Sequence, residues 1–179
     1  MSSSMTDEQK DRLEKLVALT TAIIAVFLSI SSILGSNADS DTLIFRGHAN
    51  DQWSYYQSKS IKQNLYESNL QMLTIEFARP TNTGEFKKMV EEKIKNNQEK
   101  ISKYETEKNE IKKKAEDFET LSEKSNEQGD VYDMAEGFYQ IAIILAAVAL
   151  IAKQKKMWLL SCLLGAVAVC ITGYAYLLM

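Results

Sequence analysis

Two uncharged runs near the end of the sequence decide the fold. They read FYQIAIILAAVALIA (residues 138–152) and MWLLSCLLGAVAVCITGYAYLLM (residues 157–179), with KQKK (residues 153–156) between them. At about 1.5 Å per helical residue, the second run is long enough to cross a hydrocarbon core about 30 Å thick. The first run is short by itself, and the residues just before it extend its helix. The pair predicts two transmembrane helices, at 130–152 and 157–179, joined by a basic loop at 153–156.

A third uncharged run lies near the N-terminus. It reads LVALTTAIIAVFLSISSIL (residues 16–34) and predicts a transmembrane helix at 16–36 after a polar segment at 1–15. The alternative is a secretory signal peptide, with Ser36 and Ala38 as the small residues of its cleavage site. We favour a retained anchor, because the polar segment is rich in acidic residues and the apolar run is longer than that of a typical signal peptide.

The composition favours helices throughout. The chain of 179 residues has one proline and seven glycines, so few residues would break a helix. Its mean hydropathy of -0.23 averages apolar ends with a charged middle. The sequence therefore predicts an all-α membrane protein, with three transmembrane helices and a long antiparallel, coiled-coil-like helical hairpin outside the membrane at 37–129.

The first arm of this hairpin carries two apolar rows at helical spacing. Two rows on one helix indicate two partners or one broad buried face. One row holds Trp53, Tyr56, Ile61, Leu65, Met72 and Ile75, and the other holds Tyr66, Leu70, Leu73 and Phe77.

A turn is expected at 79–84, because Pro80 disfavours helix at the preceding residue and Gly84 suits a turn. The second arm then follows a heptad pattern typical of a weak coiled coil. Its seam residues are Val90, Ile94, Ile101, Tyr104, Ile111, Ala115 and Phe118, interrupted by Asn97, Lys108 and Ser122.

Two further interruptions of the helices are expected. The small and acidic segment at 37–41 would cap or interrupt the first helix as it leaves the membrane. Gly129 is the next candidate break, with Asp130 as the cap of the helix that enters the membrane.

The charges that flank the apolar runs predict the orientation. The loop at 153–156 carries three positive charges and the segment before the first run also contains basic residues, whereas acidic residues flank the other ends. Under the positive-inside rule the N-terminus and this loop are cytoplasmic and the hairpin is extracytoplasmic. The net charge of -3 and the lack of a large basic patch argue against nucleic acid as a partner.

Candidate sites for chemistry are weak. His48 and Asp51 share one helical face, but a solvated acidic collar explains the nearby carboxylates better. Cys162 and Cys170 lie in the last apolar run without a histidine or another thiol beside either, and the glycines are isolated. We therefore predict no enzyme activity, no metal and no cofactor.

Other features indicate packing. The segment DQWSYYQSKSIKQ (residues 51–63) could bind a partner or lipid headgroups through its aromatic residues, but Trp53 and Tyr56 are one turn apart and fit a packed seam better. In the last run, Ser161, Gly165, Val169 and Gly173 recur every four residues. Small residues permit close helix packing, either between the three spans or between copies of the chain.

Three segments together resemble a family of small bacterial membrane proteins known only as a domain of unknown function. They are ALTTAIIAV (18–26), DQWSYYQSKSIKQ (51–63) and YDMAE (132–136) running into QIAII (140–144). The resemblance covers nearly the whole chain. It implies a bacterial inner-membrane protein and carries over no activity.

These patterns lead to two hypotheses on function. The first is a non-enzymatic membrane protein that self-assembles as a homo-oligomer and serves as a scaffold. Its predicted partners are the lipid bilayer and further copies of itself, and the sequence does not identify another protein partner. The alternative is a subunit of an oligomeric membrane pore or transport component.

Overall fold

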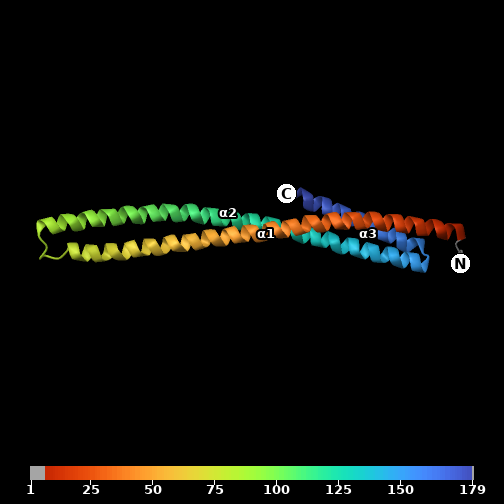
Figure 1. Cartoon of the computed structure of the whole chain (residues 1–179), viewed down its shortest axis with the longest axis horizontal. Coiled ribbons are helices and arrows are strands. Elements are labelled where there is room, and N and C mark those ends of the chain that lie inside the picture. The colour runs from red at the N-terminus through yellow and green to blue at the C-terminus, as the bar shows by residue number, and fades with distance from the viewer. Residues whose placement is uncertain (1–6, 179) are drawn as a thin grey trace. The chain divides into compact units, whose positions relative to one another are not determined.

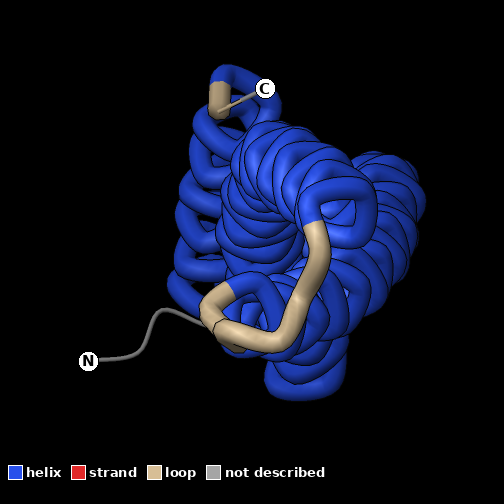
Figure 2. The backbone as a smooth tube through the Cα atoms, turned by 90° about the vertical axis from the view of Figure 1, so that its left-hand side faces the viewer, coloured by secondary structure: helices blue, strands red, loops and turns tan. Residues whose placement is uncertain are grey.

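The computed structural model describes residues 7–178, which form three helices. They are α1 (Asp7–Phe77), α2 (Gly84–Ala152) and α3 (Lys155–Leu177), labelled in Figure 1, where the colour follows the chain from red to blue. Between residues 7 and 178 the backbone has no strand, and short loops join the helices (Figure 2). The all-α class expected from the composition is confirmed.

The chain divides into two compact units, and α1 and α2 each contribute to both. The first unit combines the chain up to Leu43 with the chain from Glu123 onward, and the second unit is Ile44–Ser122. The division follows the composition, since the apolar runs fall in the first unit and most charged residues in the second.

In the first unit, α1, α2 and α3 pack through small residues. One core cluster joins Ile24 of α1, Tyr139 and two alanines of α2, and Ala168 of α3. A second cluster joins Leu13 and Val17 to Ala146, with Trp158 packed against it. Alanine at the contacts lets the helix backbones approach closely.

All three helices are long and apolar enough to cross a membrane. Their most apolar stretches have mean hydropathies of 2.3, 1.9 and 1.9, and only 17%, 28% and 17% of these stretches is buried. Most residues of these stretches are therefore not buried within the structure.

In the second unit, α1 and α2 lie side by side in opposite directions. Three contacts occur in reverse order along the two helices: Phe45 with Phe118, Lys59 with Glu107, and Tyr66 with Tyr104. The α2 residues that the heptad places in the seam are buried or half-buried here: Val90, Ile94, Ile101, Tyr104, Ile111, Ala115 and Phe118.

Two predictions of helix breaks, at Gly129 and at residues 37–41, were wrong. α2 continues without a break through Gly129, which is buried against Ala38 and Asp39 of α1. An isolated glycine costs a helix only about 1 kcal/mol, and the packing of Gly129 against α1 offsets this cost. Asp130 does not cap a helix start; its carboxylate accepts a hydrogen bond from Asn126, one turn earlier in the same helix.

α1 likewise continues through residues 37–41, which were expected to cap or interrupt it. The hydroxyls of Ser40 and Thr42 donate hydrogen bonds to backbone carbonyls four residues earlier, at 2.8 and 2.9 Å. These side chains thus satisfy their polar groups inside the helix.

The loop between α1 and α2 lies where Pro80 and Gly84 place it. α1 ends at Phe77 and α2 begins at Gly84, so the loop is residues 78–83, close to the turn expected at 79–84. The Asn82 side-chain amide donates to the carbonyl of Glu76 at 2.6 Å and ties the loop to the end of α1.

The loop between α2 and α3 is shorter than the expected 153–156, since α3 already begins at Lys155. Lys153 has a φ of 51°, and the backbone N–H of Gln154 donates to the carbonyl of Ala149 at 3.2 Å. This is the hydrogen bond of a Schellman motif, a helix end that normally uses glycine where Lys153 stands.

Candidate assembly surfaces

Polar side chains tie the three helices of the first unit together. Ser161 of α3 is buried and donates to the carbonyl of Ala142 in α2 at 2.7 Å. The hydroxyls of Tyr139 and Thr172 lie 3.1 Å apart, and the Trp158 indole N–H donates to Thr20 at 3.1 Å. Each bond joins two different helices, so these polar groups are satisfied within the unit.

The row of small residues predicted on α3 is split by the structure. Gly165 is buried, and a Cβ added there would lie 3.1 Å from Cδ1 of Ile24. Gly173 is exposed, and a Cβ there would meet nothing within 4 Å. Ser161 and Gly165 therefore pack against the other helices of the unit, whereas Gly173 does not.

A second close approach in this unit was not predicted from the sequence. Gly35 of α1 lies against Tyr132 of α2, and a Cβ added at Gly35 would be 3.1 Å from the Cβ of Tyr132. Tyr132 is almost completely buried, although acidic residues surround it in the sequence. The signal that could have found this contact is the isolated glycine at the end of the first apolar run, because a glycine there lets another helix approach closely.

A cavity of about 190 Å³ lies in the first unit. Its lining is mainly apolar and includes Ile24, Phe27, Cys162 and Gly165. Tyr139 also lines it, but its hydroxyl is engaged with Thr172. The described residues around this cavity include no carboxylate, lysine, arginine or histidine, so its lining fits an apolar group.

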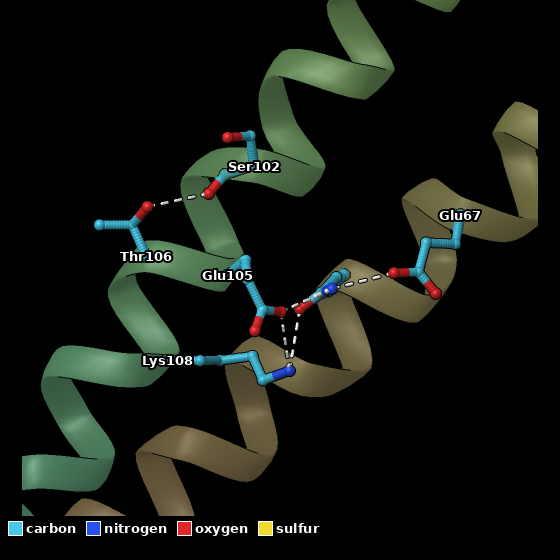
Figure 3. Close-up of polar contacts among 6 residues, drawn as sticks. Glu67, Ser102, Glu105, Thr106 and Lys108 are labelled. Atoms are coloured by element: carbon cyan, nitrogen blue, oxygen red, sulfur yellow. Dashed lines mark hydrogen bonds and ion pairs between the residues drawn. The ribbon is translucent and has the colours of Figure 1, made fainter.

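A polar layer crosses the seam between α1 and α2 in the second unit. The buried Gln63 side chain donates to Glu67 at 2.9 Å and to Glu105 at 3.0 Å, and it accepts from Lys108 at 3.0 Å (Figure 3). Nearby, Lys59 forms an ion pair with Glu107 at 2.7 Å. A polar residue in a coiled-coil seam fixes the register of the helices at some cost in stability.

The contacts of this layer shift pKa values toward the charged forms. The short contact with Glu107, and then the one with Tyr55, raises the pKa of Lys59. Lys59 in turn lowers the pKa of Glu107. The hydrogen bond from Gln63, followed by the charge of Lys108, lowers the pKa of Glu105.

From the sequence, Lys108 was predicted only as an interruption of the heptad, and Gln63 was not predicted to have a role. A signal was present, because both arms place a polar residue at a seam position near the middle of the pair. Gln63 and Lys108 meet only in one register of the two arms. That register cannot be predicted from the sequence of either arm alone.

The aromatic segment near the start of the second unit also packs within the pair. The Trp53 indole donates to Glu119 at 2.8 Å, and the Trp53 and Tyr56 rings meet edge to face at 5.6 Å. Lys108 lies over the Tyr56 ring at 5.3 Å. Trp53 and Tyr56 thus lie on the face toward α2, apart from the row of Ile61 to which the sequence spacing assigned them.

The His48–Asp51 pair gains no further support as a site. Both residues are exposed, and the His48 ring centroid lies 5.1 Å from that of Phe118. Among the described residues, no group of three or more His, Cys, Asp and Glu side chains is placed to hold a metal ion.

The two apolar rows of α1 have different surroundings. The row of Tyr66, Leu70, Leu73 and Phe77 is half-buried, on the side where Tyr66 meets Tyr104 of α2. Ile61, Leu65, Met72 and Ile75 face outward, with exposed fractions of 69%, 60%, 62% and 65%. We call these four residues the outer row; they remain an uncovered apolar surface in a highly charged unit.

Comparison with known proteins identifies a family. No curated protein and no solved structure matches the chain. A family model described as "Domain of unknown function (DUF4337)" matches residues 13–178, which covers nearly all of the three helices. This confirms the resemblance to an uncharacterised family that was drawn from the sequence: the chain belongs to the DUF4337 family.

Proposed function

We propose that this chain is a membrane protein with three spans that self-assembles and serves as a non-enzymatic scaffold. The observation that carries the proposal is the small buried share of the apolar helix stretches, 17%, 28% and 17%. Exposed apolar surface of this extent requires lipid or a protein partner. Helices are suited to lipid, because their backbone polar groups are bonded internally.

The contacts within the first unit support three packed spans. Residues 16–36 and 157–179 hold no charged side chain, and α2 has none between residues 137 and 152. The hydroxyl of Ser161 and the indole of Trp158 both find partners on another helix, which is the common solution for polar groups in lipid.

The charge pattern supports the orientation within this proposal. The N-terminus and the loop at 153–156 lie in the cytoplasm, and α1 and α2 form a helical hairpin on the other side. The family resemblance supports the inner membrane of a bacterium as the location.

A scaffold accounts for the second unit better than catalysis does. Its conspicuous polar side chains, Gln63, Lys108 and Glu105, bond to one another across the two helices. Such a layer sets the pairing of helices, and these three side chains are thereby engaged with one another instead of being directed at a substrate.

The test is a fractionation followed by a mass measurement. We expect the chain to stay with membranes until detergent is added, and to run in mild detergent as a multiple of its mass of 20.2 kDa. A chain that dissolves without detergent, or one that is monomeric in it, would contradict the proposal. Conductance of the purified sample in planar bilayers would replace the scaffold with the pore alternative.

A further inference from the structure

The outer row of α1 has the spacing of a coiled-coil seam. Residues 61, 65, 68, 72 and 75 alternate in steps of four and three, and all except Ser68 are large and apolar. This is the repeat that lets two helices pack knobs into holes. The four apolar residues are 60–69% exposed, so nothing in the described part of the chain covers this seam.

α2 offers no comparable surface in the second unit, all of which the structure describes. Its large apolar residues with high exposure there are Phe86 and Met89 near the loop and Leu121 at the other end. Between Val90 and Phe118 its outward face is lysine, glutamate and other polar residues. A helix that packs on an apolar heptad of the second unit would therefore bind α1 and not α2.

We propose that the outer row is the seam on which α1 of a second copy packs, parallel and in register. The proposal rests on the proposed function, which places both copies in one membrane with the same orientation. Their α1 helices then cross the membrane in the same direction, so a two-fold axis brings each residue of the row opposite its own counterpart.

The residues that flank the outer row favour a second copy over a charged partner. In the heptad that puts Leu65 and Met72 at position a, the g positions are the amides Gln57, Asn64 and Gln71. In a parallel pair they lie opposite the e positions of the second copy, which are Lys62, Asn69 and Glu76. No pair of like charges arises, and each amide can hydrogen-bond to the residue opposite it.

The first test is the double variant Ile61→Asp/Leu65→Asp in the full chain, with the mass of the assembly measured in mild detergent. Two carboxylates per chain in the seam would separate the α1 helices, so the mass of the assembly is expected to halve. The matched control is Met89→Asp, which changes an apolar residue of the same unit with an exposed fraction of 47% and should leave the mass unchanged.

The outcomes separate this inference from the proposed function. If the unchanged chain is monomeric, both fail. If it assembles and the double variant keeps the same mass while its helix content is intact, the seam is overturned and assembly through the membrane spans remains. Circular dichroism of each variant supplies the helix content.

The second test fixes the direction of the helices by oxidative cross-linking. In a Cys162→Ala/Cys170→Ala background, chains with Ile61→Cys should cross-link to one another, and so should chains with Ile75→Cys. A pair that cross-links only when the two variants are mixed would be antiparallel and would overturn the proposal. Absence of any cross-link would overturn it as well.

Discussion

At the scale of single residues, two glycines with the same sequence pattern have different surroundings. Gly165 and Gly173 are both members of the four-residue repeat on α3. Of the two, Gly165 lies against another helix, where the Ile24 side chain occupies the space that a side chain would need. Spacing identified the row, but the neighbouring helix decides which of its members must be small.

Gly165→Val is expected to destabilise the packing of the three helices by about 1–3 kcal/mol, the usual cost of overfilling a packed contact. Gly173→Val, with open space around it, should stay within about 0.5 kcal/mol of the unchanged chain. Thermal unfolding in detergent, followed by circular dichroism, measures both. Equal losses for the two variants would contradict the contact between Gly165 and Ile24.

The polar layer of the second unit predicts a dependence of stability on pH. The folded pKa values of Glu105 and Glu107 are lowered from the ordinary 4.5, so their stabilising effect is present above 4.5 and is lost as the pH falls through the lowered values. The pKa of Lys59 is raised from 10.5, so its effect is present below 10.5 and is lost as the pH rises through the raised value.

The melting temperature of the second unit should therefore fall as the pH is lowered. The fall should be smaller in Glu107→Gln, because this variant has no carboxylate at position 107 to protonate. Trp53 fluorescence in a Trp158→Phe background reports on this unit, because Trp53 bonds across the pair to Glu119. The matched control is Glu110→Gln, at an exposed position of the same helix, which should keep the full acid loss. If the melting temperature falls equally with decreasing pH in both variants, the Lys59–Glu107 pair has no role in this dependence.

At the scale of elements, the sequence predicted the helices well and their breaks unevenly. Proline is a strong signal, because its ring and missing N–H end a helix locally, and the loop at 78–83 follows from Pro80. A glycine in a helix costs little and yields to packing, so Gly129 remains inside α2. The heptad of the second arm predicted its buried side because that signal is repeated over many turns.

What the sequence could not supply was the pairing of the elements. The contact of Gln63 with Lys108 and the outward direction of Ile61 both depend on which face of α1 meets α2. The two apolar rows were visible, but spacing alone did not show which of them the second arm would cover.

The end of α2 leads to a prediction at this scale. Lys153 holds a left-handed backbone conformation that costs a side-chain-bearing residue about 1–2 kcal/mol. Lys153→Gly is expected to raise stability by about 1 kcal/mol in thermal unfolding. Lys156→Gly removes the same charge from a helical position of α3 and should instead lose up to about 1 kcal/mol. A gain from both would show that charge and not the Schellman geometry governs this loop, and a gain from neither would contradict the cost assigned to the left-handed conformation of Lys153.

At the scale of the whole molecule, one pair of helices serves two different surroundings. α1 and α2 each run from an apolar unit into a charged one without a break in the helix. In the apolar unit the contacts use alanine, glycine and buried hydroxyls, whereas in the charged unit they use a heptad seam and a polar layer. This difference supports the proposal that the same two helices lie in lipid in the first unit and in water in the second.

The proposed orientation of the chain follows from its short flanks, and single cysteines test it. The loop at 153–156 carries three lysines and no acid, which favours the cytoplasm under the positive-inside rule. The cysteine-free background carries either Asn109→Cys in the second unit or Gln154→Cys in this loop; both positions are exposed.

In intact cells, a membrane-impermeant maleimide is expected to label Asn109→Cys, and to label Gln154→Cys only after permeabilisation. The reverse pattern would overturn the orientation and keep the three spans, since the two sites would still lie on opposite sides. Labelling of both sites from outside would overturn more, because residues 130–152 of α2 lie between them in the chain and would then not cross the membrane. The experiment thus separates the inference from charge, which sets the direction, from the inference from apolar length, which sets the crossing.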